Sequence, residues 1–374
     1  MNLGLRGIRW RQIDPVLLLA TMGLTVFGVL LVASATRQYY DPPRLVGNSW
    51  FMKELVFAVL GIVGMVGCAC IPPRALRTLA FPLYGISVVA LAAVLGLGHG
   101  LRDYGAQRWF ELGGVQFQPS EPAKVALMLA LARVLSTSTV GARTTIASAV
   151  LLAAPAALIY AQPDLGTALS LIAIWLGMLV MSRTPARYLV AVGALGISAL
   201  PLSWLAMKDY MRERILIFLN PKADALGQGY NILQAQMSIG SGGMWGKGLF
   251  EGTQTQLRFL RVSHSDFIFS VLGEELGFVG AVVLFGLFLA LLLRVIRAHD
   301  VADDGFGAMV CAGVVSMIAF QAVANLGANV GLTPVTGIPL PFVSYGGSAL
   351  MTQLAAIGLV QATLVRRRLY RFEA

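Results

Sequence analysis

The sequence predicts an all-α polytopic membrane protein. Of its 374 residues, 57% are hydrophobic and only 12% are charged, whereas a soluble domain carries about 25% charged residues. Mean hydropathy is +0.75. Apolar runs long enough to cross the hydrocarbon recur along the chain, and we expect them to be helices because lipid offers the backbone no hydrogen-bond partners.

We predict about ten transmembrane helices in a single membrane domain, residues 1–374. They lie near residues 15–35, 55–71, 78–98, 122–136, 145–162, 164–181, 188–207, 267–293, 306–330 and 348–365. The first ends near Ala33-Ser34-Ala35, which imitates the cleavage site of a signal peptide. Its roughly 20 apolar positions exceed the about 7–15 of such a signal, so we expect an uncleaved span.

The distribution of Lys and Arg predicts that both termini are cytoplasmic. The side that carries the termini receives 15 of the 28 basic residues, and the other side receives six outside the large loop 208–266, between helices 7 and 8. Basic loops favour the cytoplasm, so this loop is predicted to be extracytoplasmic, with loops 99–121 and 331–347. The net charge of +10 then reflects topology and anionic lipids, and no nucleic acid partner is expected.

Loop 99–121 leads into the fourth span and carries two sets of polar residues. Arg108 and Trp109 lie in a glycine-rich stretch, and Glu121 and Lys124 follow at the helix start. Residues three apart pair on one helical face. Two interpretations are open: an interfacial helix start with a surface ion pair, or a functional charged pair at the mouth of the bundle.

Asp164 lies in a very short turn between the fifth and sixth spans. Aspartate at such a position is suited to cap the following helix. The alternative is that Asp164 orients a ligand at the outer face.

The long loop contains Arg212 and Arg214, and then the glycine-rich segment GSGGMWGKG at 240–248. Arginine has the planar fork that binds phosphate oxygens. The segment around Lys247 fails the Walker A pattern at two positions, which excludes an ATPase of that type. A glycine backbone with one lysine is still suited to approach a pyrophosphate closely.

His264 and Asp266 stand where the long loop becomes the eighth span. Desolvation at this boundary is expected to raise the pKa of Asp266 toward that of a useful base, and helix capping is the alternative. Glu274 and Glu275 lie about 12 Å deeper by helical rise, and an ionised side chain at mid-bilayer costs about 2.5–3.5 kcal/mol. We expect at least one of them to face another helix, a polar cavity or a proton.

Residues 329–350 contain three prolines and several glycines that cannot continue a helix. We predict a broken, re-entrant segment that lines a cavity, because irregular backbone survives at membrane depth only there or under protein cover. Two functions fit: an enzyme acting on a lipid-linked, phosphate-bearing substrate, or a transporter or lipid flippase. The outer-face charges and the lack of an internal repeat favour the enzyme, whereas the two glutamates favour the transporter.

Taken together, these motifs resemble the SEDS family (shape, elongation, division, sporulation), the bacterial peptidoglycan polymerases. The matching residues are IPPR at 71–74, GAQRW at 105–109, FQPSEPAK at 117–124, AQPDLGT at 161–167, GSGG and GKG within 240–248, HSDFIFSVLGEELG at 264–277, and PLPFVSYGGS at 339–348. The resemblance covers nearly the whole chain. It favours the RodA branch, which serves elongation, on Gly252-Thr253-Gln254 and PVTGIPLP at 334–341.

The resemblance implies a glycosyltransferase of the bacterial cytoplasmic (inner) membrane that polymerises lipid II on the outer face, with a lipid II flippase as the alternative. Asp266 would be the general base, and undecaprenyl pyrophosphate would leave. A divalent cation, Mg²⁺ or Mn²⁺, is a candidate to stabilise that group, and no organic cofactor is expected. The implied partners are a class B penicillin-binding protein and other membrane proteins of the elongation complex. The implied substrate-binding residues are Arg108, Trp109, Glu121, Lys124, Asp164, Arg212, Arg214, Lys247, His264 and Ser344.

One departure from the family pattern lies next to Asp266. The family usually reads L-P-E-x-H-T-D-F, and here Arg261 and Val262 stand at the Pro and Glu positions. The change removes a possible metal or substrate contact and puts in doubt any role for a second carboxylate there. Ser265 in place of threonine keeps the hydroxyl, and Asp266 itself is unaffected.

Overall fold

Each predicted span is a helix in the computed structural model, which describes residues 12–37, 49–98, 107–112, 115–137, 140–224, 227–260 and 262–366. Eight of these helices are long and apolar enough to cross a membrane. They are α1 (Pro15–Arg37), α2 (Ser49–Cys70), α3 (Pro73–Leu97), α5 (Ala142–Ala161), α7 (Ala186–Ala206), α11 (Ile268–Asp300), α12 (Gly305–Val330) and α13 (Gly347–Val365). The chain is therefore a helical polytopic membrane protein.

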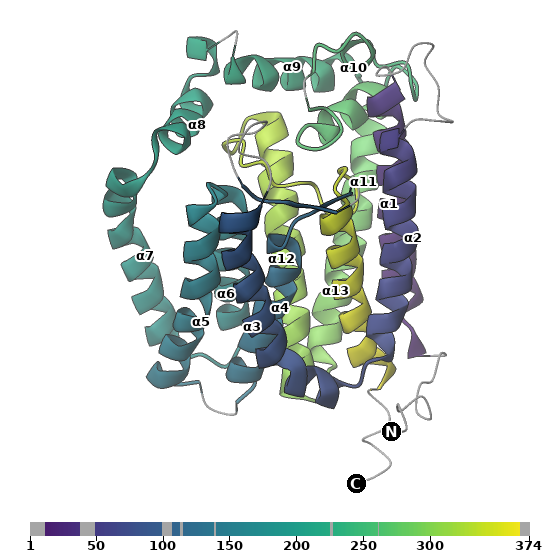
Figure 1. Ribbon diagram of the computed structural model, residues 1–374. Coiled ribbons are helices and arrows are strands. Elements are labelled where there is room, and N and C mark those ends of the chain that lie inside the picture. Colours follow the sequence, from purple (N-terminus) through teal and green to yellow (C-terminus); the bar gives the residue numbers. More distant parts are fainter. Residues whose placement is uncertain are drawn as a thin grey trace.

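The two remaining helices of the bundle are shorter, and the count of ten spans stays a prediction because of them. α4 (Ser120–Leu135) has 16 residues and α6 (Leu165–Met181) has 17, at or below the shortest length that usually crosses a bilayer. α4 lies inside the bundle, since 12 of its residues are buried. α7 is the opposite case, because it stands at the periphery in Figure 1 and none of its described residues is buried.

The predicted loops contain short elements of their own, gathered at one end of the bundle (Figure 1). The long loop folds into α8 (Asp209–Leu219), the 3₁₀ helix η3 (Pro221–Asp224), α9 (Gln228–Ser241) and α10 (Thr253–Gln256). The loop before α4 contains an antiparallel hairpin of β1 (Phe110–Leu112) and β2 (Val115–Phe117). The hairpin is the one departure from the predicted all-α class among the described residues. Its strands have only three residues each, which is too short for a period-2 pattern to be recognised in the sequence.

The opposite end of the bundle is tied together by polar contacts between α1, α11 and α13. Asp14, which precedes α1, accepts a hydrogen bond from Arg294 Nε at 2.7 Å. Its main-chain N–H donates to Gln361 Oε1 at 3.1 Å, and its carbonyl accepts from Gln361 Nε2 at 3.2 Å. The start of the first span and the end of the last therefore lie on the same side of the bundle.

α11 is interrupted at Gly277, where the glycine-rich loop (residues 240–248) packs against it. Gly277 has φ 63° and ψ −158°, a combination that only glycine adopts readily. The interruption frees two N–H groups beyond it. Phe278 N donates to the Gly243 carbonyl at 2.9 Å, and Val279 N donates to the Met244 carbonyl at 3.1 Å.

The loop also donates to the carbonyls that precede the interruption. Lys247 N donates to the Glu274 carbonyl and Gly248 N to the Glu275 carbonyl, both at 3.0 Å. A Cβ on Gly246 would clash with the Glu275 carbonyl. Gly246 is thus required by the close approach of the loop to α11, and binding of the loop to a pyrophosphate stays a prediction.

Replacement of Gly277 tests this interlock. We expect Gly277→Ala to lower the free energy of unfolding by about 1–3 kcal/mol, because alanine is strained at this φ and ψ and its Cβ would meet Gly246 N. Thermal unfolding of the purified protein in detergent measures the loss. Gly286→Ala on the same helix is the matched control, since no atom lies within 4 Å of the added Cβ. Equal thermal stability of the two variants would contradict the interlock.

Candidate functional site

Asp266 lies immediately before α11, and α12 holds its main chain in place. Its carbonyl accepts hydrogen bonds from Asn325 Nδ2 at 3.1 Å and from Asn329 Nδ2 at 2.9 Å. Asn329 Oδ1 in turn accepts from the N–H and the hydroxyl of Ser270, at 3.2 and 2.7 Å. α11 has no side-chain cap of its own, so an asparagine from the neighbouring helix supplies it. The half-buried Asp266 side chain accepts from Ser265 Oγ at 3.2 Å.

Of the predicted re-entrant segment, residues 329–350, the structure leaves 331–346 between α12 and α13, and this part enters the bundle beside Asp266. Leu340, Phe342 and Val343 are fully buried. Gly28, in the middle of α1, lies so close to this segment that a Cβ would clash with the Phe342 carbonyl. Ser344 Oγ donates to the Ser265 carbonyl at 2.6 Å, so the structure places Ser344 as a support for the residue before Asp266.

The His264 ring lies in an aromatic cluster. Its centroid is 4.6 Å from that of Trp50 and 5.6 Å from that of Tyr345. The His264 carbonyl accepts from Tyr345 N at 2.9 Å. Burial lowers the pKa of His264 to about 4, so the imidazole is neutral at physiological pH and anchors the loop that carries Asp266.

Arg108 and Arg214 bring positive charge to the Asp266 carboxylate. Burial raises the pKa of Asp266 above its ordinary range, and the Ser265 hydrogen bond and the charges of Arg214 and Arg108 offset part of this rise. A carboxylate with a raised pKa is a better proton acceptor than an ordinary aspartate. The structure therefore brings together three of the residues that were predicted from distant parts of the sequence.

The two arginines are held in place through main-chain carbonyls, and not through carboxylates. Arg214 Nη1 donates to the Val335 carbonyl at 3.2 Å. Arg108 Nε donates to the Gln162 carbonyl at 3.2 Å, and its Nη2 donates to the Pro163 carbonyl. Neither guanidinium forms an ion pair with a carboxylate in the part of the chain that the structure describes.

Arg212, two residues before Arg214, points away from Arg214 along α8. Its Nε and Nη2 donate to the carbonyls of Trp204 and Leu205 at the end of α7, at 3.2 and 3.0 Å. It also pairs with Asp209 at 3.7 Å. Because residues two apart on a helix do not face the same side, α8 directs one of its two predicted arginines to the site and the other to α7.

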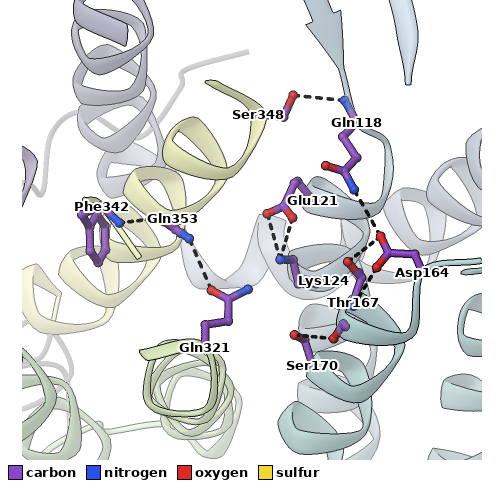
Figure 2. Close-up of polar contacts among 11 residues, drawn as sticks. Gln118, Glu121, Lys124, Asp164, Thr167, Ser170, Gln321, Phe342, Ser348 and Gln353 are labelled. Carbon is purple, nitrogen blue, oxygen red and sulfur yellow. Dashed lines mark hydrogen bonds and ion pairs between the residues drawn. The ribbon is translucent and has the colours of Figure 1, made fainter. Parts of the chain in front are cut away.

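Glu121 and Lys124 form an ion pair that is buried in the bundle and not on its surface. Lys124 Nζ lies 2.8 Å from the Glu121 carboxylate, and the two side chains are 3% and 2% exposed. In Figure 2 the pair lies between Gln353 and Gln321 on one side and Asp164 on the other. The interpretation as a surface ion pair is therefore wrong, and a pair at the base of the polar interior is what the structure contains.

Asp164 caps α6, as one of its two interpretations predicted. Its carboxylate accepts from Thr167 N at 3.1 Å and from Thr167 Oγ1 at 2.9 Å. Gln118 Nε2 approaches the same carboxylate at 3.4 Å, and Gln118 N donates to Ser348 Oγ at 3.1 Å (Figure 2). Asp164 thereby links the start of α6, the segment before α4 and the start of α13.

Lys247 is paired with Glu274, and both predicted glutamates hold the loop that precedes the site. Lys247 Nζ lies 2.8 Å from Glu274 Oε1, and the same carboxylate accepts the N–H groups of Gln254 and Thr255. Glu275 accepts from Ser34 Oγ at 2.6 Å and from Phe250 N at 3.2 Å. Glu275 thus faces another helix, α1, as was expected of at least one of the two glutamates, and a phosphate role for Lys247 stays a prediction.

A hydrocarbon layer that ends at Arg294 would have the two glutamates near its other edge and not at its centre. Glu275 precedes Arg294 on α11 by about 28 Å at 1.5 Å per residue, which is close to the about 30 Å thickness of the hydrocarbon. Arg294 pairs with Asp14 at the opposite end of the bundle. The cost of burying charge at mid-bilayer therefore does not apply to the glutamates in full.

Three residues at the site were missed by the sequence interpretation. Asn325 and Asn329 are four apart in the apolar run of α12, a polar pair on one helical face that was a usable signal. Tyr210 precedes Arg214 by the same interval of four residues on α8.

Trp109 is half-buried beside Arg108, and its binding role stays a prediction. Arg261 lies outside the described residues.

No group of three or more His, Cys, Asp or Glu side chains in the described ranges is arranged to hold a metal ion. Mg²⁺ commonly takes one or two carboxylates and completes its shell with water and substrate phosphates. The residues around Asp266 therefore do not form a dedicated metal site, and the predicted divalent cation stays a prediction.

Comparison with known proteins places this arrangement in a family. The model of the cell cycle protein family that joins FtsW, RodA and SpoVE matches residues 15–369. The peptidoglycan glycosyltransferase MrdB of Escherichia coli (strain K12) is 38% identical over 361 residues, 96% of this chain and 95% of that protein. The probable peptidoglycan glycosyltransferase FtsW of Trichlorobacter lovleyi is 37% identical over 363 residues, 94% of this chain and 93% of that protein.

Two solved structures are also similar to this chain. A peptidoglycan synthase complex, described as coordinating polymerization and crosslinking, contains a chain with a TM-score of 0.81 and 34% identity, covering 96% of this chain and 99% of that one. The rod shape determining protein RodA of Thermus thermophilus has a TM-score of 0.70 and 32% identity, covering 96% of this chain and 98% of its own. The similarity therefore extends over nearly the whole fold.

The buried Glu121–Lys124 pair gives a stability prediction. We expect Lys124→Met to lower the free energy of unfolding by about 3–5 kcal/mol, because it leaves the Glu121 carboxylate buried without its partner. The double variant Glu121→Leu/Lys124→Met should recover most of this loss. Thermal unfolding in detergent of the two single variants and the double variant measures the coupling, and strictly additive losses would contradict a mutually dependent pair.

Proposed function

This chain belongs to the family of FtsW, RodA and SpoVE cell cycle proteins, and on that basis we propose that it is a peptidoglycan glycosyltransferase that polymerises lipid II during cell elongation. The proposal is carried mainly by one observation. A half-buried carboxylate with a raised pKa, Asp266, lies in the field of two arginines that have no carboxylate partner among the described residues. A base beside unneutralised positive charge suits a reaction that removes a proton and releases an anion.

In the proposed reaction, the 4-hydroxyl of the acceptor N-acetylglucosamine attacks C1 of the donor N-acetylmuramic acid. The O4–C1 bond forms while the bond from C1 to the diphosphate oxygen breaks. The hydroxyl proton passes to the Asp266 carboxylate, and the electron pair leaves with undecaprenyl pyrophosphate. Attack from the opposite face inverts C1 and gives the β-1,4 link.

Arg108 and Arg214 stabilise the negative charge that develops on the leaving diphosphate. Their positions are set by main-chain carbonyls, so the charges are in place before the reaction and little reorganisation is needed. A Mg²⁺ or Mn²⁺ ion at this site would take most of its ligands from the substrate phosphates and from water.

We propose that ten helices, α1 to α7 and α11 to α13, cross the cytoplasmic (inner) membrane. Both termini are then cytoplasmic, as the distribution of basic residues predicts. α8, α9, α10 and the start of α11 lie at the other end (Figure 1), so Asp266 faces the outer side, where lipid-linked donor and acceptor would meet.

The proposed partner is a class B penicillin-binding protein that cross-links the new strand, with other membrane proteins of the elongation complex. The similar synthase complex, which coordinates polymerization with crosslinking, supports a partner of this kind. The flippase alternative loses its main support, because Glu274 and Glu275 are engaged in holding the loop before the site and do not line a described transport path.

Replacement of Asp266 tests the proposed function. We expect Asp266→Asn to lower glycan synthesis from lipid II by about 10²–10⁴-fold, the usual contribution of a general base. Gel analysis of product made with the partner's transpeptidase blocked measures it. Asp300→Asn, an exposed carboxylate at the other end of α11, should behave as wild type. Full polymerisation by Asp266→Asn would contradict the assigned base, and leaflet exchange of lipid II without any glycan would favour the flippase.

The pH dependence of polymerisation reports on Asp266. The base acts in its ionised form, so kcat/KM should fall as pH drops through the raised pKa, at a pH above the ordinary aspartate value of about 3.9. Arg214 lowers this pKa, so Arg214→Gln should move the acid limb to higher pH. Arg212→Gln, whose charge is directed at α7, should leave the limb where it is. Identical shifts in both variants would contradict a specific effect of Arg214.

A further inference from the structure

The Tyr210 hydroxyl is a buried donor that has no partner among the described residues. Its oxygen is inaccessible to solvent and forms no hydrogen bond, although an unpartnered buried hydroxyl usually costs free energy. Burial raises the pKa of Tyr210, so the hydroxyl keeps its proton at physiological pH and can donate it. This hydroxyl can therefore donate to an acceptor that the described residues do not supply.

Tyr210 belongs to the same charged environment as Asp266. The charges of Arg108 and Arg214 act on the Tyr210 hydroxyl and on the Asp266 carboxylate alike. On α8, Tyr210 and Arg214 are four residues apart and therefore share one face, while Arg212 is turned to the end of α7. The face of α8 directed at the site thus carries one cation and one uncharged donor.

We propose that Tyr210, Arg108 and Arg214 together bind the diphosphate of the lipid-linked donor, with the Tyr210 hydroxyl donating to a phosphate oxygen. This inference rests on the proposed function and adds a residue to it. Two guanidiniums that form no ion pair with a carboxylate among the described residues, together with one neutral donor, complement an anion with several acceptor oxygens. A neutral sugar hydroxyl would not require either charge.

The position of Tyr210, Arg108 and Arg214 fits the diphosphate of the donor and not that of the acceptor. Asp266 takes the proton from the oxygen that attacks C1, and the diphosphate leaves from that same carbon. Reacting atoms approach to about 3–3.5 Å before bond formation, so the leaving diphosphate lies within the field of groups that also act on Asp266. The acceptor's own diphosphate is separated from its 4-hydroxyl by the length of a disaccharide.

The test is direct binding of undecaprenyl diphosphate to the purified full-length protein, compared between wild type, Tyr210→Phe and Tyr188→Phe. We expect Tyr210→Phe to bind about tenfold to a hundredfold more weakly, the usual loss for a hydrogen bond to a charged group, and to lower kcat for lipid II polymerisation. Tyr188→Phe is the matched control, because it also removes a tyrosine hydroxyl beside an arginine, Arg187 at 3.2 Å, near the start of α7. It should bind as wild type does.

Further probes separate the possible sources of the effect. Undecaprenol, which lacks phosphate, should bind equally to wild type and Tyr210→Phe, and an equal loss for both lipids would overturn a phosphate contact. Displacement of the probe by phosphatidylglycerol as readily as by inorganic pyrophosphate would assign the site to a phospholipid headgroup and overturn the diphosphate assignment. Unchanged binding and polymerisation by Tyr210→Phe would overturn the role of Tyr210 alone. Failure of wild type to make glycan would instead overturn the proposed function.

Discussion

Two asparagine amides of α12 hold the main-chain carbonyl of Asp266, and the rest of the site depends on this contact. Asn329 also accepts from the first turn of α11, so one side chain fixes both the start of the helix and the residue before it. A base must be held by a rigid support to act on a substrate. Because Asn325 also donates to the Ile338 carbonyl at 2.9 Å, the re-entrant segment and Asp266 are positioned by the same helix.

Positive charge in this bundle is divided between pairs that support the fold and groups that remain available for a ligand. Lys124, Lys247 and Arg294 each lie against a carboxylate, as buried charge requires in a poorly solvating environment. Arg108 and Arg214 are held by carbonyls, and neither forms an ion pair with a carboxylate among the described residues. This contrast, and not the number of basic residues, is what supports the proposed diphosphate site.

The segment that contains Asp266 is held by contacts at both of its ends. Before the helix, Ser344 and Tyr345 fix the backbone of residues 264 and 265. Further along, the interruption at Gly277 lets the glycine-rich loop join the helix through four main-chain hydrogen bonds. The segment between these points is buried and continuous, so the position of Asp266 is coupled to the loop that covers this end of the bundle.

The sequence by itself determined the helical elements of this protein. Ten helical ranges, an irregular segment between the last two spans and the cap that was one of two interpretations of Asp164 followed from hydropathy and from proline and glycine placement, whereas the role of Asp266 stays a prediction. These are local properties, since each depends on a short window of the chain. Only the tertiary structure decided which charges meet. It separated Arg214 from Arg212, buried Glu121 with Lys124, and left the Tyr210 hydroxyl buried without a hydrogen-bond partner among the described residues, because such contacts depend on how distant helices pack, and spacing along one helix does not specify its neighbours.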